Sequence, residues 1–166
     1  MRRRVHYPQP QKTEPLMANK EDNTKALPTR EADGRREVLC PVRRRWVALT
    51  PEEEVRQATI VMLHSYYGYP LELMQVEGTI TLNGMSRRCD IVAYDNEGRP
   101  SLIVECKRNS VPITQKVCDQ ACRYNTVLRV PYLLLTNGLQ QVIIAVDFEK
   151  QRLVQLADIP FFLKKS

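Results

Sequence analysis

Residues 89–108 constrain the fold most, because they read as two β-strands joined by a tight turn. The first part, residues 89–94, alternates in side-chain direction, and residues 101–107 form a run rich in Leu, Ile and Val. Residues 95–98 are turn formers, and Gly98 can adopt a positive φ. The stretch therefore predicts a β-hairpin.

Charged side chains stand where the two strands of this hairpin meet. Asp90 lies at the start of the first strand, whereas Glu105 and Lys107 lie at the end of the second. The start of one hairpin strand and the end of the other are neighbours, so we expect the three side chains to converge. The period of two also places Glu105 and Lys107 on one face of their strand.

Two neighbouring carboxylates resist ionising together unless a cation lies between them. Mg²⁺ suits such a place, since it takes one or two carboxylates together with water and phosphate oxygens. A lysine beside the ion could orient or deprotonate water and neutralise developing charge. The alternative is a surface hairpin with a Glu–Lys pair worth about 0.2–1 kcal/mol. The E-x-K triplet alone favours that alternative, whereas Asp90 and the motifs below favour a metal site.

Asp90 followed by Glu105-Cys106-Lys107 resembles the core of PD-(D/E)xK nucleases, in which these groups sit on adjoining strands. More closely, the chain resembles the N-terminal nuclease domain of type I restriction enzyme R subunits, from about residue 36 to residue 162. The segments that carry this resemblance are residues 49–57, 89–94, 103–107, 120–124 and 136–138.

The resemblance implies a restriction-endonuclease-like α/β/α core, with a mixed central sheet flanked by helices, and a metal-dependent DNA endonuclease. It implies that Asp90, Glu105 and the Cys106 carbonyl hold Mg²⁺, which Mn²⁺ can replace. Lys107 then positions or activates the attacking water. A glutamate from the first helix often joins this site in the fold, and Glu52 resembles it, with Glu53 as the next candidate. The alternative for Glu52 is a plain acid in the first helical turn.

Other residues are expected to face DNA. Gln120 and Tyr124 lie four apart on a predicted helix and share one face. This Q-x-x-x-Y spacing resembles a motif that lies beside the metal site and contacts DNA or positions catalytic groups. An ordinary core aromatic is the alternative for Tyr124. Arg87, Arg88 and Arg108 are further candidates for phosphate contacts, with Arg87 and Arg88 on opposite sides of their strand.

The first clear helix begins at Thr50, followed by Pro51 and by Glu53 three residues after the cap. This is a capping box, in which Glu53 is expected to reach back to the Thr50 amide. The helix should end near Gly68. Glu77, on the next strand, could approach the site, although an exposed acid is the simpler interpretation.

The remaining pattern completes an α/β order. Two short strands are predicted within residues 38–47, a helix from Thr114 to about residue 127, and strands at residues 131–136, 141–148 and 152–156. A helix, three strands, a helix and further strands describe a sandwich with one parallel, right-handed crossover.

Composition bounds the class of protein. The chain has 166 residues, enough for one domain with a core, and no apolar run approaches the roughly 20 residues of a membrane span. Five cysteines without a C-x-x-C pair, and only two histidines, disfavour a zinc site and suggest reduced thiols in the cytoplasm. No apolar segment follows the basic N-terminus, so secretion is not expected.

The net charge of +6 is unevenly placed. Residues 1–50 hold twelve Lys and Arg against six Asp and Glu, whereas residues 51–166 hold thirteen of each. Residues 1–35 are polar and without periodicity, and are interpreted as a disordered or loosely attached basic arm before a nuclease-like domain at residues 36–163.

No P-loop motif is present, so the chain is expected to be a stand-alone nuclease without a motor, a partner for a separate motor, or a vestigial module. The expected partners are DNA and a separate motor or other restriction-system subunits. The sequence gives no signal of oligomeric state. One alternative function is a non-cleaving nucleic-acid-binding or assembly module with the same fold. Another is a metabolic enzyme, which would have a deep apolar pocket with polar groups away from Asp90 and Glu105.

Overall fold

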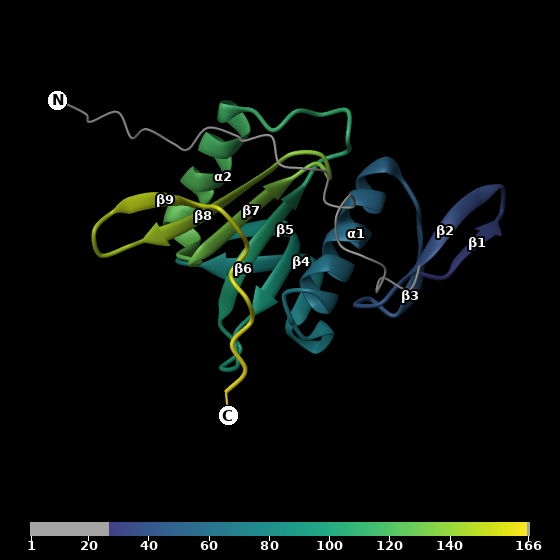
Figure 1. The fold of residues 1–166 in the computed structure, drawn as a ribbon, viewed down its shortest axis with the longest axis horizontal. Coiled ribbons are helices and arrows are strands. Elements are labelled where there is room, and N and C mark those ends of the chain that lie inside the picture. Colours follow the sequence, from purple (N-terminus) through teal and green to yellow (C-terminus); the bar gives the residue numbers. More distant parts are fainter. Residues whose placement is uncertain (1–26, 166) are drawn as a thin grey trace.

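A mixed six-stranded sheet forms the centre of the molecule in the computed structural model, which describes residues 27–165 (Figure 1). Its strands lie side by side in chain order: β4 (Met74–Leu82), β5 (Met85–Tyr94), β6 (Pro100–Cys106), β7 (Tyr132–Thr136), β8 (Gln141–Asp147) and β9 (Arg152–Leu156). Only β6 and β7 are parallel, and α2 (Gln115–Leu128) makes the crossover between them. A 3-10 turn, η1 (Leu71–Leu73), precedes β4.

The two helices cover opposite faces of this sheet. On one face α1 (Pro51–Ser65) packs Ile60 and Leu63 in a cluster with Leu102 of β6. On the other face Cys118 of α2 packs in a cluster with Ile103. The central parallel strands are buried on both sides, which explains their continuous apolar runs. The predicted α/β/α arrangement with a mixed sheet is confirmed.

Local rules explain most element boundaries. Thr50 caps α1, since its Oγ1 accepts a hydrogen bond from the Glu53 amide at 3.1 Å. Thr114 caps α2 in the same way through Val117. The β4–β5 turn occurs at Asn83 and Gly84, both with positive φ, as its N-G dipeptide predicts.

The second half of the predicted capping box is wrong. The Thr50 amide donates to the Ala48 carbonyl at 3.1 Å, whereas the Glu53 side chain is buried among arginines. A capping glutamate normally faces solvent at the helix end. Here two guanidinium groups lie within reach of Glu53, and a charge-assisted contact is stronger than one to a neutral amide.

A separate N-terminal sheet lies beside α1 (Figure 1). It contains β1 (Thr29–Ala32), β2 (Arg35–Cys40) and β3 (Arg45–Ala48), all antiparallel. The two strands predicted within residues 38–47 are confirmed as β2 and β3. The N-terminal arm was predicted to extend to residue 35, but β1 already begins at Thr29. This polar strand has no apolar pattern and is held by its backbone hydrogen bonds with β2. The rest of that arm, residues 1–26, lies outside the described residues.

No helix within residues 27–165 is long and apolar enough to cross a membrane.

Candidate active site at the end of the β5–β6 hairpin

The β5–β6 hairpin brings Asp90 to the end of β6. Regular pairing between the strands runs as far as Ile91 and Val104. Beyond this pair the Asp90 side chain replaces the backbone as hydrogen-bond acceptor, because its Oδ2 accepts a hydrogen bond from the Cys106 amide at 2.7 Å. Asp90 is thus fixed against the strand segment that carries Glu105 and Lys107. The charges of Asp90 and Lys107 both act on the pKa of Glu105.

The other Asp90 oxygen faces α1. Its Oδ1 accepts a hydrogen bond from Nη2 of Arg56 at 2.9 Å. Arg56 also contacts Glu53, and its Nη2 lies 3.3 Å from Glu52 Oε1. Burial alone would lower the pKa of Arg56, but the hydrogen bond to Asp90 and the charges of Glu53 and Asp90 raise it, so the guanidinium stays charged. Arg56 therefore joins Glu52 to Asp90.

A second arginine extends this cluster to the N-terminal sheet. Arg43, in the turn between β2 and β3, contacts Glu53 and places Nη1 3.2 Å from Glu77 Oε2. Glu77 has a φ of +54° inside β4 and also binds Arg88 at 2.6 Å. Glu77 is therefore half-buried between arginines on the Asp90 side of the site. This arrangement corresponds to the alternative in which Glu77 approaches the site, and not to that of an exposed acid.

Glu105 has its own cationic partner. Arg87 Nη2 lies 2.7 Å from Glu105 Oε1, and both side chains are largely buried. The Arg87 guanidinium carbon also lies 4.6 Å from the centre of the Tyr124 ring. Tyr124 is 41% exposed, so it is not the core aromatic that was its alternative. Gln120, one turn earlier on α2, is exposed as well.

The pKa of Glu105 is raised, chiefly because the carboxyl is buried. Burial raises its pKa to about 7, and the charges of Asp90 and Glu52 add to this rise, while Arg87 and Lys107 oppose it. A carboxyl with a pKa this high gains from an added positive charge. Lys107 itself is half-buried, and its amide donates to the Thr136 carbonyl at 2.9 Å.

The other predicted DNA-facing arginines take different places. Arg88 points away from Arg87, to Glu77, and is 68% exposed at its side chain. Arg108 is exposed just beyond the end of β6. The opposite orientation of Arg87 and Arg88 agrees with the alternation predicted for the strand.

Asp90 and Glu105 are hard oxygen donors, the type of ligand that a divalent cation such as Mg²⁺ prefers. Asp90 and Glu105 supply carboxylates beside the Cys106 backbone, and Mg²⁺ usually takes only one or two carboxylates, with water and phosphate completing its shell. Within residues 27–165, no three His, Cys, Asp or Glu side chains form a metal-binding group. A metal here would therefore rest on two carboxylates and a carbonyl, in the place of contacts now made by Arg56 and Arg87.

Sequence reasoning missed Arg43 and Arg56. Arg56 had a usable signal, since it lies four residues after Glu52 on a helical face that also carries Ile60 and Leu63. A charged residue on an apolar face indicates a buried ion pair. Arg43 had none, because its partners Glu53 and Glu77 are 10 and 34 residues away.

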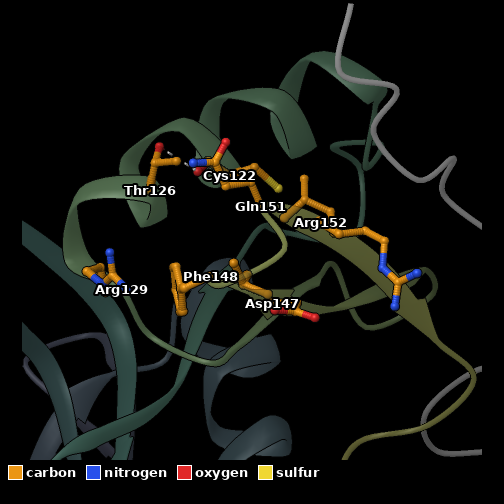
Figure 2. Close-up of a pocket in the computed structure, with 9 residues that line it drawn as sticks. Cys122, Thr126, Arg129, Asp147, Phe148, Gln151 and Arg152 are labelled. Carbon is orange, nitrogen blue, oxygen red and sulfur yellow. Dashed lines mark hydrogen bonds between the residues drawn. The ribbon is translucent and has the colours of Figure 1, made fainter.

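A cavity of about 400 Å³ lies elsewhere, between the end of α2 and the β8–β9 hairpin (Figure 2). Its residues are Cys122, Thr126, Arg129, Val146, Asp147, Phe148, Gln151, Arg152 and Leu153. Burial raises the pKa of Cys122 to about 12, Arg129 packs on the Phe148 ring, and Asp147 accepts the Lys150 amide. The cavity lies away from Asp90 and Glu105, and no nucleophile and base are paired among its residues.

The mixed sheet between two helices defines an α/β protein, with Asp90 and Glu105 near one end of its β5–β6 hairpin. Residues 51–160 match the model of the family described as type I restriction enzyme R protein N terminus, and the chain belongs to this family. The resemblance inferred from the sequence is thereby confirmed.

A similar solved structure is the fragment structure of a putative HsdR subunit of a type I restriction enzyme from Vibrio vulnificus YJ016. It shares 19% identity with this chain at a TM-score of 0.47, over 68% of this chain and 24% of that one. The chain thus spans about a quarter of the length of that structure. No curated protein matches the sequence.

Proposed function

We propose that this chain is a divalent-metal-dependent DNA endonuclease that hydrolyses phosphodiester bonds. The observation that carries the proposal is the 2.7 Å hydrogen bond from the Cys106 amide to Asp90. It fixes one carboxylate against the strand that carries Glu105 and Lys107. Membership in the family of type I restriction enzyme R protein N termini supports DNA as the substrate.

Three groups would hold the ion: the carboxylates of Asp90 and Glu105 and the carbonyl of Cys106. A bound Mg²⁺ or Mn²⁺ supplies Lewis acidity that stabilises charge on the phosphoryl group. The Cys106 thiol takes no part, since it is buried and burial raises its pKa. Glu52 tunes the site from α1 through its contact with Arg56.

The cationic groups of the site act on water and phosphate. Lys107, two residues after Glu105, positions the attacking water or takes up its proton. Arg87 has a buried Nη1 without a hydrogen-bond partner among the described residues, and a phosphate oxygen would satisfy it. Tyr124 supports Arg87, and exposed Gln120 extends the same wall toward DNA.

Nicking of supercoiled plasmid by purified protein tests the proposal, with Mg²⁺ or Mn²⁺ and with EDTA. We expect metal-dependent relaxation that Lys107→Ala lowers by about 100-fold or more. Asp90→Asn should have a similar effect. Lys150→Ala, an exposed lysine in the β8–β9 turn, is the matched control and should leave nicking unchanged.

The second candidate is a non-cleaving DNA-binding or assembly module. It is favoured by the arginines that hold the two carboxylates in place, Arg56 on Asp90 and Arg87 on Glu105. Equal nicking by wild type and Lys107→Ala, together with retained DNA binding, would support it. In either case we propose other subunits of a restriction system as partners of the chain.

A further inference from the structure

Three consecutive arginines, Arg43 and Arg44 in the turn before β3 and Arg45 at the first position of β3, take two different environments. Arg43 turns inward, where its side chain is 11% exposed and contacts Glu53 and Glu77. Arg44 and Arg45 are exposed. Within residues 27–165, neither of them lies within 4.0 Å of an acidic side chain. The turn and the first residue of β3 thus carry two exposed guanidinium groups beside one that is anchored.

The backbone conformation at Arg44 is unfavourable for a residue with a side chain. Arg44 has a φ of +54°, in the left-handed region. A residue with a Cβ is less stable in this conformation by roughly 1–2 kcal/mol, and glycine is not. An arginine at this position is therefore not explained by the requirements of the turn itself.

Excess positive charge is confined to the same part of the described chain. Residues 27–50 hold six Arg against three Asp and Glu, whereas residues 51–165 hold thirteen positive and thirteen negative residues. Part of the charge of the N-terminal sheet is neutralised by pairs such as Arg30 with Glu37 at 2.7 Å. Of the six arginines in residues 27–50, Arg35, Arg44 and Arg45 have no acidic partner among the described residues, and Arg44 and Arg45 are adjacent.

These two arginines lie next to a chain of contacts that reaches the proposed site. Arg43 and Arg88 bind the two oxygens of Glu77, at 3.2 and 2.6 Å. Arg43 also shares Glu53 with Arg56, which binds Asp90. Exposed Arg88 therefore stands on the Asp90 side of the same cluster to which the turn is anchored.

We infer that Arg44, Arg45 and Arg88 form a docking surface for the phosphate backbone of duplex DNA, which sets the approach of the duplex to Asp90 and Glu105. The inference rests on the proposed function for its substrate. Guanidinium groups suit phosphate because they donate two parallel hydrogen bonds. Contacts of this kind position a duplex without reading its sequence.

Salt dependence of DNA binding tests this surface without any cleavage. Fluorescence anisotropy of two short labelled duplexes of unrelated sequence is measured in EDTA at several KCl concentrations. The double variant Arg44→Gln/Arg45→Gln should weaken binding equally for both duplexes. The slope of log K against log salt should become shallower by about 1.8, since each lost phosphate contact removes about 0.9.

The matched control is Lys150→Gln/Arg152→Gln, which removes the same charge at the β8–β9 end of the sheet. In this control the slope of log K against log salt should change by less than about 0.45, half of what one phosphate contact contributes. Far-ultraviolet circular dichroism of each variant checks that the fold is retained. An equal loss of slope in both double variants would overturn the inference, because net charge rather than this surface would then account for binding.

The outcome separates this inference from the proposed function. Plasmid nicking that depends on Lys107, with an unchanged slope in Arg44→Gln/Arg45→Gln, overturns the docking surface and leaves the nuclease standing. A shallower slope together with nicking that ignores Lys107→Ala supports the surface on a non-cleaving module. Absence of DNA binding by the wild type overturns the surface.

Discussion

Arg56 and Asp90 form an ion pair of 2.9 Å in which the arginine, 7% exposed, is buried more deeply than its 19% exposed partner. The pair connects α1 to β5 beneath the proposed site. Because Arg56 also pairs with Glu52, Glu53 and Glu77, one buried cation contacts four acids. The geometry of Asp90 therefore depends on a helix that lies 34 residues earlier in the chain.

Replacing Arg56 should destabilise the protein strongly. Arg56→Met leaves Glu53 and Asp90 partly buried without their shared partner, and loss of one member of a buried pair costs about 3–5 kcal/mol. Arg56→Lys keeps the charge and should cost less. Urea unfolding followed by circular dichroism measures both, with exposed Arg99→Met as the control. A neutral Arg56→Met would mean that the cluster adds nothing to stability.

Tyr124 should act through its ring rather than its hydroxyl. The Arg87 guanidinium lies 4.6 Å from the ring centre, and such contacts are worth about 0.5–2 kcal/mol. On the proposed function, Tyr124→Ala should lower the nicking rate about 5-fold, the equivalent of about 1 kcal/mol. Tyr124→Phe keeps the platform and should retain most of the rate. Equal losses in both variants would assign the effect to the hydroxyl instead.

Stability without metal should fall as the pH rises through the range set by Glu105. Its pKa is raised from 4.5 to about 7, first by burial, so the folded state binds more protons than the unfolded state between these values. The free energy of unfolding should thus decrease from about pH 4.5 to about pH 7, by on the order of 3 kcal/mol at most.

Urea unfolding in EDTA at several pH values measures this dependence. Glu105→Gln carries no ionisable group, so its stability should change less than that of the wild type over the same range. If the free energy of unfolding of the wild type, relative to that of Glu105→Gln, rises between pH 4.5 and 7, the raised pKa of this carboxyl is contradicted.

The cap of α1 gives a smaller effect. Thr50 Oγ1 accepts the Glu53 amide at 3.1 Å, and removal of such a cap costs about 1 kcal/mol. Thr50→Ala should lower the free energy of unfolding by this amount, whereas Thr50→Ser should be nearly neutral. Urea unfolding of both variants measures this difference. No difference between the variants would show that the hydroxyl does not cap.

The sequence by itself determined the elements that follow local rules. The hairpin of β5 and β6, the turn at Asn83 and Gly84, and the helix starts at Thr50 and Thr114 all depend on neighbours along the chain. The meeting of Asp90 with the end of β6 also followed from the sequence, because register in a hairpin is set by its turn.

Only the tertiary structure decided which cations meet these acids. Glu53 was expected to cap its helix but binds Arg43 and Arg56. Glu105 pairs with Arg87, whose guanidinium group lies over the ring of Tyr124. The N-terminal strand β1 likewise forms through its ladder with β2 without an apolar pattern. Periodicity reports which face of an element is apolar. The choice among several arginines for one buried carboxylate is made when separate elements pack, because only then does desolvation make an unpaired charge costly.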